Sequence, residues 1–478
     1  MKLENINNVY FIGIGGIGMS ALARYFNMLG KNVSGYDKTK TKLTEELSAE
    51  GIEIHYEDNV ELIQSSILNS QSLTLVVFTP AISNENKELK YFQKNNYTIK
   101  KRAEVLGMIT QQTFTIAVAG THGKTTTSSL IVHILKSSGI DCTAFLGGIT
   151  QNYETNFLPG TDIKKSHSKK SKVKPIIIVE ADEYDRSFLN LYPDIAVITS
   201  VDADHMDIYG DKKQMEEAYS KFVSQIKKNG VLIIKQGVDK MLVFEKEEKK
   251  IFTYSLHHSS DYYARKISIK RGEYFFDAII PSQNIRGIML GIQGKHNIEN
   301  AVAAVAVAQQ MNIYIGNIKN ALSSFKGVKR RFEYHIKTNN LIFIDDYAHH
   351  PEELRACISA VKDMYPEKKI TGIFQPHLFS RTRDFADEFA RSLELLDELI
   401  LLNIYPAREE PIDGINSEML LEKIKMKNKK LCTKKEIVNE ISNREIEVLL
   451  TMGAGDIDTI VEPIKNELSA RIKNVTIN

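Results

Sequence analysis

Residues 114–126 read FTIAVAGTHGKTT, and this stretch says most about the fold. The apolar run at 114–119 predicts a buried strand, a glycine-containing loop begins at Gly120, and the pattern from Lys124 onward predicts a helix. A helix N-terminus beside such a loop binds phosphate through backbone N–H groups, while the lysine supplies positive charge and a threonine hydroxyl can hold Mg²⁺. The stretch therefore predicts a phosphate-binding loop in a parallel α/β domain.

This loop differs from the common pattern G-x-x-x-x-G-K-[ST]. That pattern requires glycine at position 118, where the chain has Val118, and Gly120 supplies a glycine later in the loop instead. The loop is therefore shorter than the usual one. The alternative is a glycine turn followed by a chance GKT, but the flanking strand and helix favour the phosphate-binding interpretation.

Length and composition describe a globular protein of several domains. A chain of 478 residues is too long for one core, and its 42% hydrophobic and 26% charged content is ordinary for globular proteins. A net charge of +2 gives no argument for a nucleic-acid or membrane partner. The three cysteines are far apart, the N-terminus does not resemble a signal peptide, and no apolar run approaches a membrane span, so we expect a cytoplasmic protein.

Short apolar strands alternate with longer helical patterns along the whole chain, which predicts mainly parallel sheets with flanking helices. Three domains are expected, at residues 1–108, 109–328 and 329–478. One segment, 164–174, is basic and has almost no apolar content. We expect it to form a solvated loop between two strands, with phosphate binding as the alternative.

The first domain contains GIGGIG at residues 13–18, which fits G-x-G-x-x-G between a predicted strand and a predicted helix. Asp37 follows the next predicted strand, in the place of a ribose-binding acid. This pattern predicts a pyrophosphate at a helix N-terminus without identifying the nucleotide, and alone it would suggest NAD. The alternative is close strand–helix packing by glycines with no ligand.

Acidic residues follow predicted strands in the second domain. Glu180 comes after the apolar run 176–179, where a carboxylate can reach Mg²⁺ beside the phosphate loop, and we expect most other acids of 180–185 to be solvated. His205 lies among acids after the next strand, as a candidate second metal ligand or an ordinary surface histidine.

Two asparagines, Asn297 and Asn300, open an Ala/Val-rich predicted helix. They lie three residues apart and so share one helix face. An asparagine can pair with the N6/N7 edge of adenine, which suggests a role in nucleotide binding. Helix capping is the alternative, and it explains Asn297 more easily than Asn300.

In the third domain, polar residues follow four predicted strands, at 341–344, 370–374, 399–402 and 448–450. Asp346, His349 and Arg381 are among them. Ligands of open parallel sheets bind outside the carboxyl ends of the strands. This edge is therefore expected to bind an anionic substrate.

Nine motifs together resemble the Mur ligase family: GTHGKTTT, EADEYDRSFL, DADHMDIYG, GKHNIENAVAA, RRFE, DDYAHHP, FQPHLFSRTRDF, YPAREEP and MGAGDI. The resemblance covers the whole chain in order. It implies a three-domain enzyme, with an N-terminal Rossmann-like domain for a UDP-sugar, a central P-loop ATPase domain, and a C-terminal Rossmann-like domain that closes the site and helps to bind an amino acid.

Within the family, the chain is similar to the branch that adds L-alanine to the D-lactoyl carboxylate of UDP-N-acetylmuramate through an acyl phosphate. This ATP-dependent, ADP-forming reaction is the first step of peptidoglycan stem-peptide assembly, and it would tie the protein to cell wall biogenesis, cell shape and cell division. A relative that attaches a tripeptide to the same sugar is the alternative, although FIGIGGIGMSALA and DADHMDIYG favour the alanine branch. An NAD-dependent oxidoreductase would explain only residues 1–40, and a nucleotide-binding module would leave the third domain unexplained.

The resemblance also implies site residues. The UDP-sugar contacts are Gly13, Gly15, Gly16, Ile17, Gly18, Asp37 and Arg102. The ATP contacts are Gly120, Thr121, His122, Gly123, Lys124, Thr125, Thr126, Asn297, Asn300, Arg331 and Asp346. The metal ligands are Thr125, Glu180 and His205, for two Mg²⁺ ions with Mn²⁺ as a substitute. The catalytic residues are Lys124, His349 and Arg381. We expect a monomer or a weak homodimer.

Two positions depart from what the family usually has. Leu378 stands where an arginine often follows QPH, so Arg381 or Arg383 would carry more of the anion binding. Several sister enzymes use a carbamylated lysine some fifteen residues after the metal histidine. That position is Ser220 here, beside Lys221, and we expect Lys221 to be an ordinary surface residue.

Overall fold

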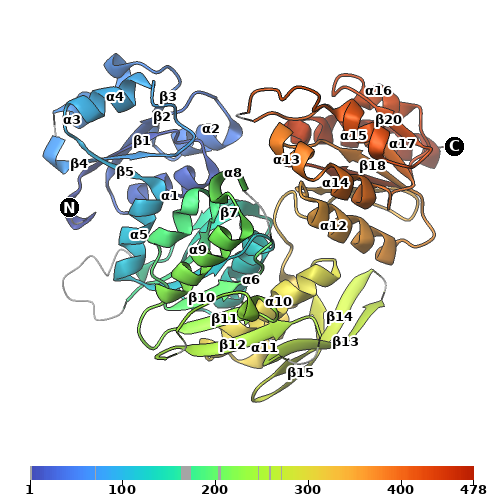
Figure 1. Ribbon diagram of the computed structural model, residues 1–478, viewed down its shortest axis with the longest axis horizontal. Helices are drawn as coiled ribbons and strands as arrows, with labels where there is room; N and C mark the ends of the chain where they lie inside the picture. Colours follow the sequence, from blue (N-terminus) through green and yellow to red (C-terminus); the bar gives the residue numbers. More distant parts are fainter. Residues whose placement is uncertain are drawn as a thin grey trace. The chain divides into compact units, whose positions relative to one another are not determined.

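The computed structural model contains three β-sheets with flanking helices, and successive parts of the chain form them (Figure 1). This confirms the predicted fold class, three domains built on mainly parallel sheets with flanking helices, while the domain boundaries stay predictions. Within the described residues, no helix is long and apolar enough to span a membrane. The structure describes residues 3–69, 71–162, 174–202, 206–245, 247–257, 260–270, 272–407 and 409–477.

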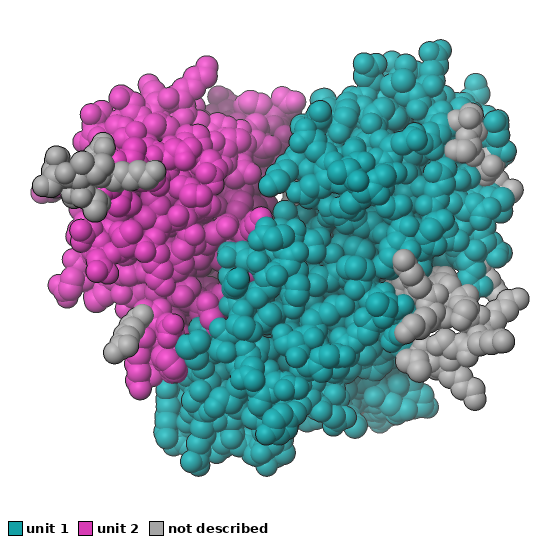
Figure 2. Space-filling model, turned by 180° about the vertical axis from the view of Figure 1, so that it is seen from behind, with its two compact units in different colours: residues 1–267, 276–290, 298–326 teal, residues 268–275, 291–297, 327–478 magenta. Residues whose placement is uncertain are grey.

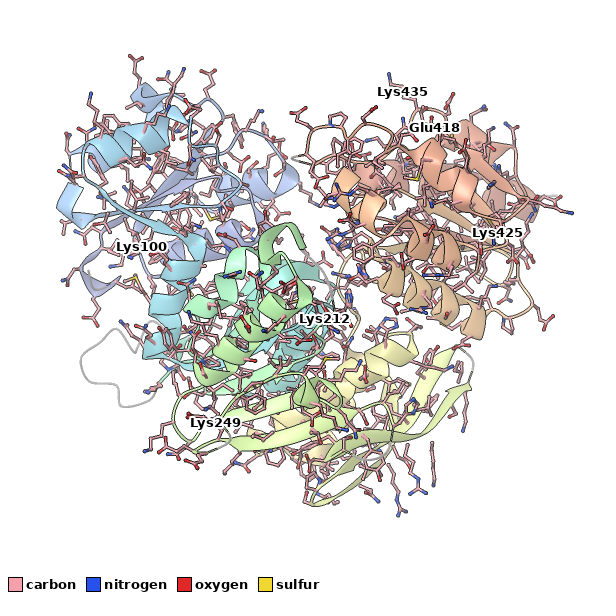
Figure 3. All side chains as sticks on the ribbon, viewed as in Figure 1. Lys100, Lys212, Lys249, Glu418, Lys425 and Lys435 are labelled. Carbon is pink, nitrogen blue, oxygen red and sulfur yellow. The ribbon has the colours of Figure 1, made fainter. Side chains whose placement is uncertain are left out.

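The chain divides into two compact units (Figure 2). The first unit comprises residues 1–267, 276–290 and 298–326, and the second comprises 268–275, 291–297 and 327–478. The first unit holds the first sheet and most of the second, and the second unit holds the third sheet. Charged side chains such as Lys212, Lys425 and Glu418, labelled in Figure 3, are exposed.

The first sheet has the strand order β3-β2-β1-β4-β5, and its strand pairs are parallel. The central strand β1 is fully buried, and its carboxyl end leads directly into the glycine loop at 13–18. Its strands are β1 (Asn8–Ile12), β2 (Asn32–Tyr36), β3 (Glu53–His55), β4 (Thr74–Phe78) and β5 (Thr98–Lys101). Its helices are α1 (Ile17–Met28), α2 (Lys42–Ala49), α3 (Ser65–Leu68), α4 (Lys87–Lys94) and α5 (Arg102–Gln112), with 3₁₀ turns η1 (Leu3–Asn5), η2 (Val60–Leu62) and η3 (Gln71–Leu73).

The second sheet has the order β15-β14-β13-β12-β11-β10-β6-β9-β7-β8. The predicted strand at 114–119 is β6, and it lies between its parallel neighbours β10 and β9. Its strands are β6 (Phe114–Ala119), β7 (Thr143–Thr150), β8 (Thr155–Leu158), β9 (Ile176–Ala181), β10 (Ile195–Ile198), β11 (Val231–Lys235), β12 (Lys250–Ser255), β13 (Tyr262–Lys270), β14 (Glu273–Ile280) and β15 (Gln283–Leu290). Its helices are α6 (Lys124–Ser137), α8 (Met206–Tyr209), α9 (Lys212–Ser224), α10 (Lys295–Gln310) and α11 (Ile315–Ser324), with η4 (Tyr184–Asn190) and η5 (Val238–Lys240).

Helix α1 joins the first two sheets within the first unit, because it packs against β7 and β8. The rings of Tyr25 and Phe145 lie 5.5 Å apart, in a hydrophobic core to which both sheets contribute. Beside them, buried Arg24 donates to Asn156 Oδ1 at 2.8 Å and pairs with Glu50 at 2.7 Å. A guanidinium buried this deeply needs such partners, so these contacts fix how the two sheets pack.

The third sheet has the order β16-β17-β21-β18-β19-β20 and is parallel except for the pair β16–β17. One hydrophobic core packs α12, α14 and α15 against the sheet, and a second core packs α16 and α17 against it. Its strands are β16 (Glu333–Lys337), β17 (Ile342–Asp346), β18 (Ile370–Phe374), β19 (Glu398–Leu401), β20 (Lys429–Leu431) and β21 (Val448–Met452). Its helices are α12 (Pro351–Met364), α13 (Phe379–Asp384), α14 (Ala386–Leu393), α15 (Ser417–Lys423), α16 (Ile437–Ser442) and α17 (Val461–Ile477), with η6 (Asp456–Ile460).

Some strands extend further than the hydrophobic runs that predicted them. Glu180 lies inside β9, paired in register with Val118, and Asp346 is the last residue of β17. Backbone pairing continues regardless of side-chain polarity, so a strand can present a carboxylate at its carboxyl end. Of the predicted basic loop 164–174, residues 164–173 lie outside the described residues.

Candidate active site

The loop 120–123 connects β6 to α6 as the sequence predicts, and the loop after β10 supports it. His122 N donates to Ser200 Oγ at 2.9 Å, and Thr121 N donates to Ser200 O at 3.2 Å. Gly120 has φ +138°, and a Cβ there would lie 2.0 Å from Thr199 Oγ1. The glycine is therefore required both by backbone conformation and by this close packing.

Helix α6 begins at Lys124, with Gly123 as its N-cap in the left-handed conformation. The predicted contact residues Thr125 and Thr126 lie in its first turn and are buried. A Cβ on Gly123 would lie 2.6 Å from Asn300 Oδ1, so Asn300 of α10 lies beside this loop. Asn297 is buried as well and donates from Nδ2 to Gln293 O at 2.6 Å.

The side chain of Lys124 turns back into its own loop. Its Nζ donates to Gly120 O at 2.7 Å and lies 2.9 Å and 2.8 Å from the two carboxylate oxygens of Glu183. Burial lowers the pKa of Lys124, but the carboxylates of Glu183, Glu180 and Asp182 outweigh burial and raise it. Burial raises the pKa of Glu183 to about 7, against the opposite effect of Lys124. The ammonium is therefore held, charged, inside the phosphate loop.

Thr125 and Glu180 lie together beside the same loop. Thr125 Oγ1 donates to Glu180 Oε1 at 2.9 Å, and Gly147 N donates to Glu180 Oε2 at 2.9 Å. A hydroxyl and a carboxylate are hard oxygen donors of the kind that Mg²⁺ prefers, so this pair fits the predicted metal site. The third predicted ligand, His205, lies outside the described residues. Within the described residues, no group of three or more His, Cys, Asp or Glu side chains could hold a metal ion.

Glu183 is the exception to the prediction that most other acids of 180–185 are solvated. Its side chain is only 2% exposed, because the next turn folds its backbone inward. Asp185 and Arg186 both adopt φ +53°, and Tyr209 Oη donates to Glu183 O at 2.6 Å. A lysine in a buried loop requires a negative charge nearby. This requirement was the one sequence signal that could have predicted the ion pair between Lys124 and Glu183.

The first glycine loop gathers the residues predicted for a UDP-sugar. Gly15 N donates to Asp37 Oδ2 at 2.7 Å, so Asp37 closes over the loop. A Cβ on Gly18 would lie 2.7 Å from Arg102 Nη1, which places Arg102 against the same loop. Within this loop Gly13 has φ +86°, Gly16 is the N-cap of α1, and Ile17 begins that helix.

Arg102 also reaches the acidic segment that follows β9. Its Nη2 lies 3.4 Å from Asp182 Oδ2. The segment 180–183 therefore reaches the surroundings of both glycine loops. Asp182 contacts Arg102 beside the first loop, and Glu180 and Glu183 bond to Thr125 and Lys124 at the end of the second. This arrangement suits two phosphate-bearing ligands that react with each other.

In the second unit, Asp346 organises the start of the third domain. Its carboxylate accepts from Phe332 N at 2.7 Å and from Ala348 N at 2.8 Å. Burial raises the pKa of Asp346 to about 6, against the opposite effect of Arg331. The Arg331 guanidinium lies 5.0 Å from the centre of the Tyr347 ring. Asp346 is thus a buried structural anchor for the turn that carries Arg331.

His349 and Arg381 both lie beside His377, a histidine that the sequence analysis did not single out. The rings of His349 and His377 are 5.9 Å apart, and Arg381 Nη1 lies 3.5 Å from His377 Nδ1. Arg381 is 6% exposed, although arginine is rarely buried without a reason. Leu378 has φ +71°, a conformation that strains a leucine, and such strain concentrates at functional sites.

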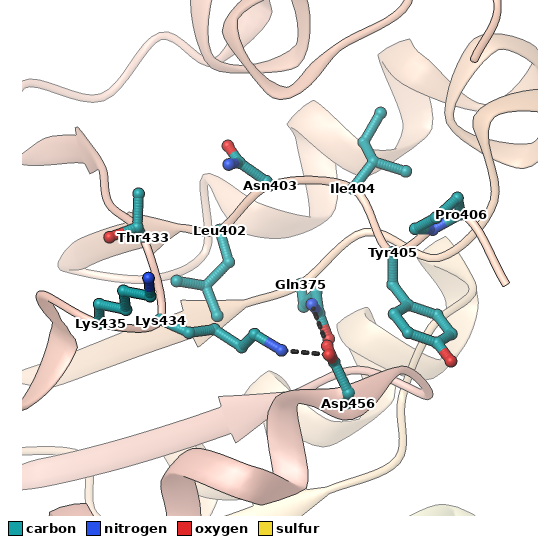
Figure 4. A pocket seen from close by; sticks show the side chains of 10 residues that line it. All are labelled: Gln375, Leu402, Asn403, Ile404, Tyr405, Pro406, Thr433, Lys434, Lys435 and Asp456. Carbon is teal, nitrogen blue, oxygen red and sulfur yellow. Dashed lines mark hydrogen bonds and ion pairs between the residues drawn. The ribbon is translucent and has the colours of Figure 1, made fainter. Parts of the chain in front are cut away.

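A pocket of about 510 Å³ lies at the carboxyl ends of β18, β19, β20 and β21 (Figure 4). Asp456 on its wall accepts from Gln375 Nε2 at 2.8 Å and forms an ion pair with Lys434. Its lining residues are Gln375, Leu402, Asn403, Ile404, Tyr405, Pro406, Thr433, Lys434, Lys435 and Asp456. The pocket places groups of both charges at the edge where parallel sheets bind ligands.

Three family models match the chain in sequence order. They are the Mur ligase family, catalytic domain, at residues 8–113, the Mur ligase middle domain at 118–308, and the Mur ligase, glutamate ligase domain, at 330–461. Among curated relatives, the UDP-N-acetylmuramate–L-alanine ligase of Flavobacterium psychrophilum is 49% identical over 98% of this chain and 100% of its own length. The enzyme of that name from Parabacteroides distasonis is 49% identical over 99% and 100%.

Solved structures agree with these matches. The UDP-N-acetylmuramate-alanine ligase of Thermotoga maritima superposes with a TM-score of 0.80 at 26% identity, covering 97% of this chain and 99% of its own. A murein peptide ligase from Psychrobacter arcticus superposes with a TM-score of 0.71 at 22% identity, covering 96% and 98%. At 22% identity, the likeness to the Psychrobacter arcticus structure shows that the two proteins share a fold.

A methyl group at Gly123 tests whether this loop binds a nucleotide. Gly123→Ala would bring its Cβ within 2.6 Å of Asn300 Oδ1, and we expect MgATP binding, measured by calorimetry, to weaken by at least about tenfold, or about 1.4 kcal/mol. Gly139→Ala is the matched control, because Gly139 has φ +76° and its Cβ would meet nothing within 4 Å. Equal affinity in the two variants would contradict the assignment of the loop.

Proposed function

The chain belongs to the Mur ligase family, and we propose that it is an ATP-dependent ligase that joins L-alanine to the D-lactoyl carboxylate of UDP-N-acetylmuramate. The observation that carries the proposal is the full-length relationship, at 49% identity, to ligases named for that reaction. The two glycine loops linked by one acidic segment support it. This reaction begins peptidoglycan stem-peptide synthesis, and we place it in the cytoplasm, carried out by a monomer or weak homodimer.

The tripeptide-attaching alternative has less support. Two solved murein peptide ligases, from Psychrobacter arcticus and Neisseria meningitides, are each 22% identical to this chain, with TM-scores of 0.71 and 0.58 against 0.80 for the alanine ligase. An NAD-dependent oxidoreductase is disfavoured too, because the chain carries a second phosphate loop, with Lys124, that such an enzyme does not need.

The reaction needs activation because a carboxylate is a poor electrophile at neutral pH. The sugar carboxylate attacks the γ-phosphorus of ATP, which forms an acyl phosphate and releases ADP. The amine of L-alanine then attacks the acyl carbon, and the tetrahedral intermediate collapses to the amide and inorganic phosphate. Protein groups mainly position the reactants and neutralise charge in such phosphoryl transfers.

Residues of the first unit would bind the two phosphate-bearing substrates. The backbone N–H groups of 120–126 and the ammonium of Lys124 would bind the ATP phosphates. Thr125, Glu180 and His205 would hold Mg²⁺. When bound, the metal would neutralise phosphate charge. We propose that the site takes two ions and that Mn²⁺ can replace Mg²⁺. The loop 13–18, with Asp37 and Arg102, would bind the UDP-sugar.

Residues of α10 and the second unit complete the proposal. Asn297 and Asn300 would contact adenine, and Arg331 would contact ATP. Asp346 would contact ATP and would also hold the turn of Arg331. His349 would orient the amine, and Arg381 would bind the anionic substrate through its planar guanidinium.

The proposed function is tested by the substrate requirement for ATP hydrolysis. We expect repeated turnover of ATP to ADP only when UDP-N-acetylmuramate and L-alanine are both present, because without the amine the acyl phosphate of the first turnover is not consumed. A panel of amino acids and the tripeptide L-Ala-γ-D-Glu-meso-diaminopimelate measures the preference for the acceptor. Turnover with the tripeptide but not with L-alanine would overturn the proposal, and so would ADP release without the sugar.

Arg381 tests the anion-binding role of the second unit. Arg381→Lys keeps the charge but loses the planar fork, and we expect kcat/KM to fall by at least about tenfold. Arg383→Lys is the matched control. Arg383 is half exposed and bonded to Asp384, and exposed ion pairs contribute little. If only the Arg383 variant loses activity, the anchor has been assigned to the wrong arginine.

A further inference from the structure

The ammonium of Lys124 already has a hydrogen-bond partner for each of its N–H groups. The ammonium has three N–H donors, and they face Gly120 O, Thr121 O at 3.4 Å and the carboxylate of Glu183. A phosphate oxygen that bonds to Lys124 must therefore share or replace one of these partners. The carbonyl oxygens belong to the loop itself, so Glu183 is the partner that can be exchanged.

The surrounding chain holds Glu183 in place. Its side chain is 2% exposed, Arg186 N donates to its carbonyl at 3.0 Å, and Tyr209 Oη donates to the same carbonyl at 2.6 Å. The left-handed residues Asp185 and Arg186 turn the chain directly after it. Glu183 is thus a carboxyl group held in place beside the ammonium, rather than a mobile surface acid.

A fixed carboxylate beside Lys124 has two opposing effects on a triphosphate. It keeps the long lysine side chain in one conformation, which saves the entropy of ordering that chain during the reaction. It also repels the phosphates and competes with them for the ammonium, because both charges lie in a poorly hydrated site. An anion with these properties weakens ground-state binding while it keeps the lysine ready for the transferred phosphoryl group.

We propose that Glu183 is a positioning residue for Lys124, an internal counter-ion that holds the ammonium at the phosphate loop and is exchanged for a phosphate of ATP. This inference rests on the proposed function for its ligand. It assigns a role to the second glutamate of EADEYD that is separate from the proposed metal ligation by Glu180.

Two substitutions separate the effect of the charge of Glu183 from the effect of its side-chain length. Glu183→Gln keeps the size and removes the charge. We expect the Kd for MgATP, measured at about pH 8, to fall by at least about threefold while kcat falls by at least about tenfold. Glu183→Asp keeps the charge but is one methylene shorter. We expect its Kd to stay within about twofold of wild type while kcat falls by at least about fivefold.

Asp185→Asn is the matched control, because it removes one negative charge from the same segment at a residue whose left-handed φ asparagine tolerates. We expect its Kd and kcat to stay within about twofold of wild type. A merely structural role for Glu183 would raise the Kd and lower the melting temperature together. A Kd for Glu183→Gln that is unchanged or raised, or a kcat within about twofold of wild type, overturns the inference.

Wild-type protein in the same experiment keeps this inference distinct from the proposed function. If wild type binds no MgATP and shows no ligase turnover, the proposed function itself is wrong. If wild type binds and turns over but Glu183→Gln shows no tighter binding, only the role of Glu183 is wrong. If Glu183→Gln does not fold, Glu183→Asp carries the test, and wild-type kcat in that variant overturns the inference.

Discussion

A buried ammonium beside a phosphate loop needs a counter-charge, and the ion pair between Lys124 and Glu183 meets that need in this protein. The positive charge that a triphosphate requires cannot be left alone in a poorly hydrated site. Strands β6 and β9 end in register, with Ala119 opposite Ala181, so the segments that follow the two strands lie side by side. Two acids of one short segment then bond to α6, Glu180 to Thr125 and Glu183 to Lys124.

The same segment explains why the first two domains behave as one unit. Asp182 reaches Arg102 beside the first glycine loop, while α1 packs against β7 and β8. The two glycine loops therefore lie on a common framework, although each belongs to a different sheet. Parallel sheets expose ligand sites at the carboxyl ends of their strands, and in the third sheet His349 and Arg381 follow β17 and β18 at that edge.

Sequence reasoning predicted the fold class and the central strands because buried parallel strands appear as short apolar runs and glycine loops have fixed spacing. It also placed the two glycine loops and Asp37 after strands and Lys124 at the start of a helix, where the structure has them, whereas Glu180, expected just after a strand, is part of β9. It could not show that Glu183 turns inward, because that depends on left-handed backbone at two following residues that are not glycine. The proximity of Arg381 to His377 likewise depends on tertiary packing. The roles of these residues in binding stay predictions.

The central claim, activation of the sugar carboxylate as an acyl phosphate, is tested most directly by following carboxylate oxygen. UDP-N-acetylmuramate labelled with ¹⁸O in its lactoyl carboxylate is incubated with ATP, L-alanine and the protein, and the released phosphate is examined by mass spectrometry. Formation of an acyl phosphate transfers one labelled oxygen to each phosphate produced. Unlabelled phosphate accompanying amide formation would show that the carboxylate is not phosphorylated, and it would contradict the account.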